Sequence, residues 1–296
     1  MKASRRQPVA KPLPHAEAFR DPRCLRGAVT RLQANASARR HLAKILPHLL
    51  RACAHSADPD RTIVNFERLV AALPNAGILY HYLAAAPGRI DQLVTIFAHS
   101  QALADTLTRD AKFFHFLIAP EALARPREKL WMQAELTRLL AGWRAAEDRY
   151  NVVRHFRRRE TLRVGARDLL GLATVEETTL ELSNLADVCL QAVFEVAVET
   201  LAAQFKIAVP GGFAVIGMGK LGGQELNYSS DVDVIFVYRE EGEFNARLTY
   251  NEFYTKLAEE FIRQVSTPGT EGAIYRIDLR LRPEGKTGAL VRSLDS

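Results

Sequence analysis

Residues 217–238 read GMGKLGGQELNYSSDVDVIFVY, and this stretch decides what the chain folds into. In its second half Asp231 and Asp233 alternate with valines. Alternate side chains of a strand point to opposite faces, so both carboxylates are expected on one face and both valines on the other. Apolar residues 234–237 continue this strand, and apolar residues 213–216 lie before the glycines. We therefore predict two buried strands joined by a glycine-rich turn.

The paired carboxylates point to a metal site. Two carboxylates this close repel each other unless a cation lies between them. Mg²⁺ prefers oxygen ligands, usually one or two carboxylates together with substrate phosphates. A third carboxylate is expected on a neighbouring strand, and Asp278 fits because residues 273–281, AIYRIDLRL, alternate well enough to form a strand. We predict that Asp231, Asp233 and Asp278 are catalytic residues that bind Mg²⁺ or Mn²⁺.

The turn before the first aspartate contains four glycines and one lysine: Gly217, Gly219, Lys220, Gly222 and Gly223. Glycine has no Cβ, so its backbone N–H groups can approach phosphate oxygens closely. A phosphate cradle shortly before an Asp-x-Asp strand is typical of nucleotidyl transfer. The alternative is a plain tight turn, with the aspartates as solvated residues at the edge of a strand.

Composition indicates a soluble globular protein. The chain has 296 residues, enough for two domains, and is 48% hydrophobic and 25% charged. No apolar run approaches the roughly 20 residues that span a bilayer, and the basic start lacks the apolar core of a secretory signal. The three cysteines show no metal-ligand spacing and no disulfide framework. We expect a cytoplasmic protein without a membrane partner.

The net charge of +6 suggests nucleic acid at first sight, but its distribution does not. Four Lys and Arg residues lie in the first fourteen residues, which contain no acid. Removing these four charges leaves +2 for the remaining residues, which is not typical of a nucleic-acid-binding domain. We expect no nucleic-acid partner and interpret residues 1–14 as a disordered basic tail.

The rest of the chain divides by its periodicity into a helical and a mixed part. Residues 15–205 have helical spacing almost throughout, and Asp58-Pro59 is a typical helix start. We predict long helices over residues 130–150 and 175–205. From residue 206 to 296, strands interleave with one amphipathic helix over residues 248–265. The expected fold class is α+β, an all-helical N-terminal region followed by a small mixed sheet with helices.

Residues 154–167, RHFRRRETLRVGAR, contain six arginines and one acid, Glu160. One interpretation is a basic surface for a phosphate, a nucleotide or an acidic partner. The other is a solvated helix face with charge pairs between adjacent turns, each contributing a few tenths of a kcal/mol. Both interpretations place the arginines at the surface.

Four segments resemble one known family, the glutamine synthetase adenylyltransferases, which are bifunctional adenylyl-transferring and adenylyl-removing enzymes. The segments are residues 217–238, YRIDLRLRPEGKTGALVRSLDS at 275–296, FRRRETLRVGARDLLG at 156–171 and ELSNLADVCLQA at 181–192. The resemblance covers about residues 50 to 296 and implies a polymerase-β-like nucleotidyltransferase fold. Chains of that family carry two such domains in tandem. We expect this chain to match the N-terminal, adenylyl-removing half, with a catalytic domain at 206–296 that lacks its C-terminal part.

The family pattern assigns roles residue by residue. Asp231 and Asp233 match its metal-binding pair, and Asp278 matches its third carboxylate. Gly219 and Lys220 stand where the wider superfamily usually has Gly-Ser or Gly-Gly, so we interpret Lys220 as a phosphate contact. The resemblance implies nucleotide or phosphate binding at Gly219, Lys220, Gly222, Gly223, Ser230, Arg280 and Arg282. For Arg280 and Arg282, charge balance for the three aspartates is the alternative.

The implied chemistry is transfer of AMP to or from a tyrosine of glutamine synthetase, which controls nitrogen assimilation. In the forward reaction ATP is the donor, and in the removing reaction phosphate attacks the adenylyl-tyrosine and gives ADP. Glutamine synthetase is the expected protein substrate, and a PII-type signalling protein is a further candidate partner. Two alternatives stay open. One is a nucleotidyltransferase with an RNA or small-molecule substrate, and the other is a truncated, non-catalytic docking module.

Overall fold

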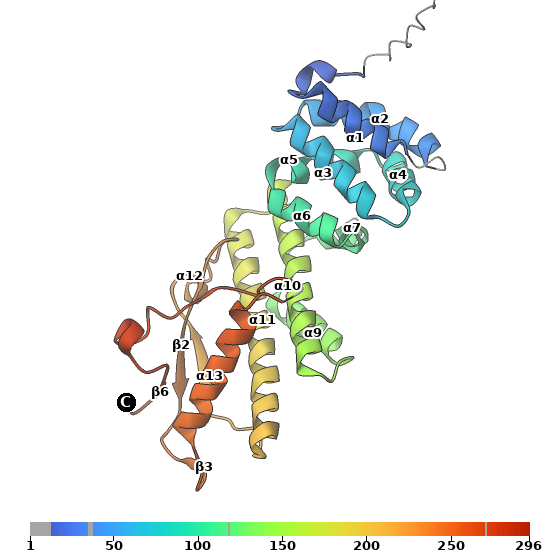
Figure 1. Cartoon of the computed structure of the whole chain (residues 1–296). Coiled ribbons are helices and arrows are strands. Elements are labelled where there is room, and N and C mark those ends of the chain that lie inside the picture. The colour runs from blue at the N-terminus through green and yellow to red at the C-terminus, as the bar shows by residue number, and fades with distance from the viewer. Residues whose placement is uncertain (1–12, 35–37, 118, 270) are drawn as a thin grey trace, which may run out of the picture. The chain divides into compact units, whose positions relative to one another are not determined.

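The computed structural model describes residues 13–34, 38–117, 119–269 and 271–296 (Figure 1). The chain divides into two compact units, Met1–Leu123 and Ala124–Ser296. The domain boundary predicted from periodicity, between residues 205 and 206, stays a prediction. The predicted disordered tail lies almost wholly outside the described residues. In the described ranges, no helix combines the length and apolar character needed to cross a membrane.

The first unit is built from short helices that pack in pairs. They are a 3-10 turn at Ala16–Ala18, then α1 Pro22–Leu32, α2 Arg39–Ala54, α3 Pro59–Ala72, α4 Ala76–Ala85, α5 Gly88–His99, α6 Gln101–Arg109 and α7 Lys112–Leu117, with α8 Pro120–Ala124 at the unit boundary. Helix α3 contacts α1, α5 and α6, while α2 contacts α4 and α5. The predicted start at Asp58-Pro59 is confirmed, because Asp58 accepts the amide N–H of Arg61 at 3.1 Å.

Three helices open the second unit: α9 Lys129–Leu140, α10 Ala146–Leu169 and α11 Val175–Phe205. The prediction of α11 is confirmed at both ends. The single helix predicted over 130–150 is wrong, because the chain turns at residues 141–145 and α10 begins at Ala146. This break lets Met132 on α9 and Tyr150 on α10 enter the same core, alongside α11.

A small mixed sheet follows, with β1 Phe213–Gly217, β2 Val232–Tyr238, β5 Ile277–Asp278 and β6 Val291–Ser293. The order is β1-β2-β5, and β6 also pairs with β2. Strand β1 is antiparallel to β2, whereas β5 and β6 are parallel to it. A hairpin of β3 Glu243–Asn245 and β4 Leu248–Thr249 precedes helix α13, Tyr250–Ser266, and α12 is a short turn at Gly219–Gly222. The structure is therefore α+β, as predicted.

The strand predicted over 273–281 is much shorter than expected. Only Ile277–Asp278 pairs with β2. Before it, the amides of Ile274 and Tyr275 donate to the carbonyl of Val265, at the end of α13. After it, the amide of Arg280 donates to the side chain of Asp278 and turns the chain away from the sheet. Hydrogen bonds outside the sheet, to the end of α13 on one side and to the Asp278 side chain on the other, thus replace the ladder that the alternation predicted.

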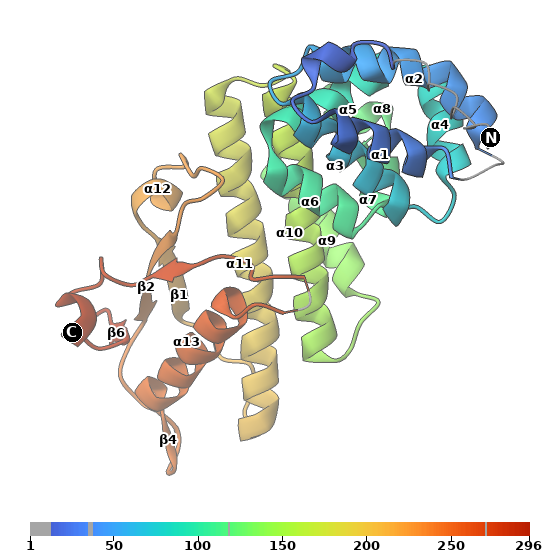
Figure 2. The same ribbon diagram turned by 45° about the horizontal axis from the view of Figure 1, so that its top comes forward.

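Helices cover one face of the sheet and leave the other open. Helix α13 lies beside the strands and next to α11 in both ribbon views (Figures 1 and 2). Phe236 of β2 meets Phe261 of α13 edge to face, with ring centroids 5.7 Å apart. The two valines beside the aspartates are fully buried, whereas Asp233 is partly exposed and Ile216 is 41% exposed on the open face. The predicted alternation is confirmed, and the carboxylates belong to the open face.

Candidate active site

Asp233 and Asp278 lie side by side where β2 meets β5. They are register partners in a parallel pair, so their side chains leave the same face of the sheet. Asp231 comes directly before β2 and is two residues from Asp233, which places it on the same face. Helix α13 separates the two segments in sequence, and only the sheet brings the three carboxylates together.

Two exposed arginines pair with these carboxylates. Arg276 donates from Nε to Asp231 Oδ1 at 2.5 Å, and from Nη2 to the carbonyl of Ser229 at 3.0 Å. Arg280 donates from Nε to Asp278 Oδ2 at 2.7 Å. Both arginine side chains are 72% exposed. Ion pairs this exposed contribute little to stability, so an incoming charge can displace either guanidinium group.

The charges of the three aspartates favour a cation at the position of the Arg280 guanidinium group. The pKa of Arg280 is raised first by its hydrogen bond to Asp278 and the charge of that residue, and further by the charges of Asp233 and Asp231. One positive group is therefore stabilised by all three carboxylates. An all-oxygen donor set is what Mg²⁺ and Mn²⁺ take in proteins. Within the described part of the chain, no three His, Cys, Asp or Glu side chains are already arranged around a metal position. The aspartates fit a divalent cation for two reasons: their ligand atoms are oxygens, and a cationic group, the guanidinium of Arg280, is stabilised by their charges.

The glycine-rich turn is shaped by close contacts that only glycine permits. Gly219 has φ +52°, and a Cβ there would lie 2.7 Å from Asp233 Oδ2. A Cβ on Gly222 would lie 2.7 Å from the carbonyl oxygen of Gly217. The backbone of α12 thus lies directly against the Asp233 carboxylate, while Lys220 is exposed on the same turn. The phosphate roles of Gly219, Lys220, Gly222 and Gly223 stay predictions.

Other predicted phosphate contacts have partners of their own in the structure. Ser230 donates to Asn227 Oδ1 at 2.8 Å and accepts the amide of Asn227 at 3.3 Å, so it closes the loop before β2. Arg282 is partly buried, and its amide donates to the carbonyl of Leu279 at 3.2 Å. Phosphate binding by Ser230, Arg280 and Arg282 stays a prediction.

The loop between α12 and β2 is tied to the long helices at two points. The amide of Leu226 donates to the hydroxyl of Ser183 on α11 at 3.0 Å. Tyr228 donates to Asp168 Oδ2 on α10 at 2.8 Å, and burial together with that carboxylate raises the pKa of the phenol. These helices therefore hold the segment that delivers Asp231.

The arginine-rich segment does not form the surface that either interpretation predicted. Residues 154–167 lie inside α10, and four of the six arginines are less than 9% exposed: Arg154, Arg158, Arg163 and Arg167. Arg163 is fully buried between Glu160 and Glu181, and it donates to both. Both surface interpretations are wrong because two further acids, besides Glu160 of the segment itself, reach the arginines from other elements. Glu181 belongs to α11 and Glu271 to the loop after α13.

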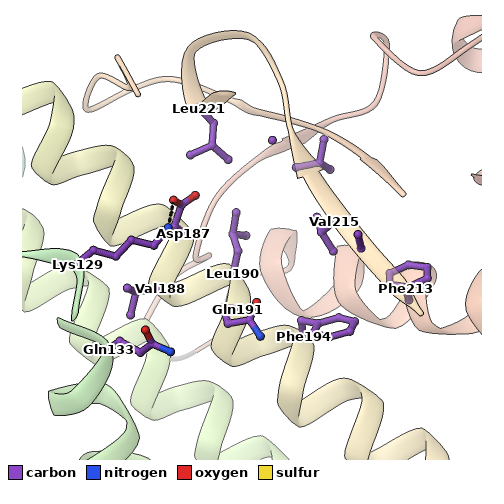
Figure 3. Close-up of a pocket in the computed structure, with 13 residues that line it drawn as sticks. Lys129, Gln133, Asp187, Val188, Leu190, Gln191, Phe194, Phe213, Val215 and Leu221 are labelled. Carbon is purple, nitrogen blue, oxygen red and sulfur yellow. Dashed lines mark hydrogen bonds and ion pairs between the residues drawn. The ribbon is translucent and has the colours of Figure 1, made fainter. Parts of the chain in front are cut away.

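A cavity of about 540 Å³ lies on the opposite, valine-bearing side of the sheet (Figure 3). Leu190 and Phe194 of α11 face Phe213 and Val215 of β1 across it, and the ion pair between Lys129 and Asp187 lies at one side. None of the three predicted aspartates lines this cavity.

Comparison with known proteins gives the family. The family model for glutamate-ammonia ligase adenylyltransferase matches residues 90–296, which include both acidic strands and α9 to α13. The chain belongs to this family. Three relatives carry the name bifunctional glutamine synthetase adenylyltransferase/adenylyl-removing enzyme. The protein of Mesorhizobium japonicum is 30% identical over 271 residues, which is 90% of this chain and 28% of the relative. That of Thioalkalivibrio sulfidiphilus is 32% identical over 274 residues, which is 88% of this chain and 28% of the relative. That of Chromobacterium violaceum is 31% identical over 266 residues, which is 90% of this chain and 29% of the relative.

The chain spans less than a third of the length of these relatives.

In this member of the adenylyltransferase family, sequence reasoning missed Arg276. A signal was available, because Arg276 is two residues before Asp278 and falls on the same side of the predicted strand. It also missed Tyr228 and Asp168, for which no local pattern exists. Their contact joins two segments 60 residues apart.

Proposed function

We propose that the chain transfers AMP to or from a tyrosine of glutamine synthetase. The observation that carries this proposal is the pairing of Asp233 with Asp278 in register on parallel strands, with Gly219 against the Asp233 carboxylate. Family membership and the names of the relatives support the substrate class. The removing direction, in which phosphate attacks and ADP leaves, is our preferred reaction for this chain.

Asp231, Asp233 and Asp278 would hold Mg²⁺ or Mn²⁺. When bound, the divalent cation neutralises charge on the phosphoryl oxygens. The chain's own residues then have three tasks. The carboxylates would define where the reacting phosphate lies. The turn at Gly219 would leave space for the phosphate oxygens. Arg276 and Arg280 would leave their aspartate partners and bind an anionic group of the substrate instead.

The removing reaction needs little proton transfer. Inorganic phosphate is already ionised near neutral pH, so no side chain has to deprotonate it. Positioning and charge neutralisation are therefore expected to supply most of the rate acceleration. In the forward direction the tyrosine hydroxyl must lose a proton, and we assign this role to the Asp278 carboxylate.

The test is release of ADP from adenylylated glutamine synthetase in the presence of phosphate and Mg²⁺. Asp233→Asn keeps the shape of the side chain but removes the charge, and we expect it to abolish ADP release while the circular dichroism spectrum stays native. Glu240→Gln is the matched control, because Glu240 is an exposed acid just beyond the other end of β2. Its activity should equal that of the wild type.

Three results would count against the proposal. Full activity of a folded Asp233→Asn variant would exclude the carboxylate assignment. An equal loss in Glu240→Gln would point to nonspecific damage. If the folded wild type released neither ADP from the adenylylated protein nor pyrophosphate from ATP with the unmodified protein, the transfer function would be refuted for this chain, and a docking role would remain.

A further inference from the structure

Helix α10 presents a row of arginines to the segment that leads from α13 to β5. Arg154 is 3% exposed, and its Nη2 donates to the carbonyl and the side chain of Gln264 at 3.3 and 3.2 Å. A Cβ on Gly269 would lie 3.1 Å from the same guanidinium group. The backbone at Gly269 therefore packs directly against Arg154.

The next two arginines hold the second half of the segment. Arg158, 8% exposed, is ion-paired with Glu271. Arg157 lies over the ring of Tyr275, with its guanidinium carbon 4.8 Å from the ring centroid. Tyr275 is itself 8% exposed. Helix α10 thus contacts the segment at its beginning, its middle and its end.

This segment leads directly into the candidate active site. Tyr275 is followed by Arg276, whose carbonyl accepts the amide of Val232 at 2.8 Å, and then by Ile277 and Asp278 of β5. A two-residue strand has too few ladder bonds to fix its own position. The contacts on its approach must therefore decide where Asp278 lies relative to Asp233.

The same helix also supports the first acidic segment. Asp168, at the end of α10, accepts the hydroxyl of Tyr228 from the loop that precedes β2. One rigid helix therefore touches both segments that bring carboxylates to the site. Burying arginine is unfavourable unless its charge and donors find partners, so this arrangement has a cost that a surface helix would avoid.

We propose that Arg154, Arg157 and Arg158 are positioning residues, and that α10 sets the spacing between the Asp278 carboxylate and the Asp231–Asp233 pair. Glu271 completes this contact by neutralising Arg158. The inference rests on the proposed function, since it concerns the geometry of the same carboxylates. None of the three arginines touches the reacting atoms.

The probe is Mn²⁺, titrated into the full chain by isothermal calorimetry. Glu271→Gln removes the charge of a partly exposed loop residue, so the variant should still fold. We expect its Mn²⁺ affinity to fall about tenfold, in line with couplings measured between contacting charged groups. Hydrogen exchange of residues 271–278 should speed up, because the segment loses its anchor. The double variant Arg158→Glu/Glu271→Arg restores the pair with reversed charges and should recover both properties.

Glu199→Gln is the matched control. Glu199 on α11 accepts from Arg149 of α10 at 2.6 Å, and Arg149 lies nine residues before Arg158 in the helix. We expect it to leave Mn²⁺ affinity and exchange of residues 271–278 unchanged. Wild-type affinity in Glu271→Gln, or an equal change in Glu199→Gln, would overturn the positioning role.

The two proposals fail in different ways. If the wild type binds Mn²⁺ no better than Asp233→Asn does, the metal assignment in the proposed function is refuted. The exchange measurement then still decides the role of α10. Unchanged exchange of residues 271–278 in Glu271→Gln would refute it, whereas faster exchange that the double variant reverses would support it.

Discussion

Replacing Gly219 by alanine tests the turn that faces the carboxylates. Gly219 has φ +52°, a left-handed conformation that costs an alanine about 1–2 kcal/mol. The new Cβ would also lie 2.7 Å from Asp233 Oδ2 and 3.3 Å from its carboxyl carbon. Asp233 must therefore retreat by several tenths of an ångström. We expect the free energy of unfolding to fall by about 1–2 kcal/mol, and Mn²⁺ affinity to fall about tenfold because a ligand leaves its place.

The matched control is Gly223→Ala in the same turn. Gly223 has φ −80°, and the atom nearest to its added Cβ is a flexible side-chain carbon of Glu225 at 3.4 Å. Alanine fits this right-handed conformation, so stability should stay the same or rise by up to about 1 kcal/mol. Mn²⁺ affinity should not change.

Urea unfolding followed by circular dichroism gives the stability of both variants, and calorimetry gives their Mn²⁺ affinity. If Gly219→Ala and Gly223→Ala behave alike in both measurements, the steric reasoning is refuted. If Gly219→Ala loses stability but binds Mn²⁺ like the wild type, Asp233 does not serve as a ligand from the position seen in the structure.

Two further predictions concern buried charges and buried thiols. Glu181→Gln should lower the free energy of unfolding by about 3–5 kcal/mol, because it leaves the fully buried Arg163 with one partner fewer. Glu199→Gln should change the free energy of unfolding by less than about 1 kcal/mol, because Glu199 is 53% exposed in its pair with Arg149. Equal effects in urea unfolding would contradict this difference. Burial raises the pKa of Cys53 and of Cys189 to about 12 from 9.0, so the folded chain keeps two protons that the unfolded chain loses above about pH 9. The free energy of unfolding should therefore be insensitive to these thiols below pH 9 and fall between pH 9 and 12. The double variant Cys53→Ala/Cys189→Ala should show a shallower alkaline fall, and an unchanged slope would exclude the thiols as its cause.

Local features of the chain predicted the elements well where their cause is local. The boundaries of α11 were predicted correctly, and its first residue follows a capping box formed by Thr174 and Glu177. The strand β2 was predicted because Asp231 and Asp233 alternate with valines over a run long enough to form a ladder. Helix α3 was predicted from Asp58-Pro59, since the cap and the proline act within one turn of the helix.

Predictions failed where the deciding partner is distant in sequence. The alternation at residues 273–281 predicted a long strand, but Val265 at the end of α13 takes the amides that a ladder would need. The helix over 130–150 was predicted from helical spacing alone, which does not show that both halves must reach the same core. The arginines of α10 were expected at the surface because two of their acidic partners, Glu181 and Glu271, lie outside residues 154–167.

Three features could be predicted from the amino-acid sequence: two carboxylates share one strand face, a glycine-rich turn precedes them, and helices dominate the first 205 residues. These follow from residue spacing and backbone sterics, which act over a few residues. Three others emerge from the folded chain: Asp278 pairs in register with Asp233, Arg276 and Arg280 form ion pairs with the carboxylates, and α10 buries arginines against the segment before β5. Pairing between segments that are distant in the chain depends on how the whole core packs. Side-chain spacing within one segment therefore cannot predict this pairing.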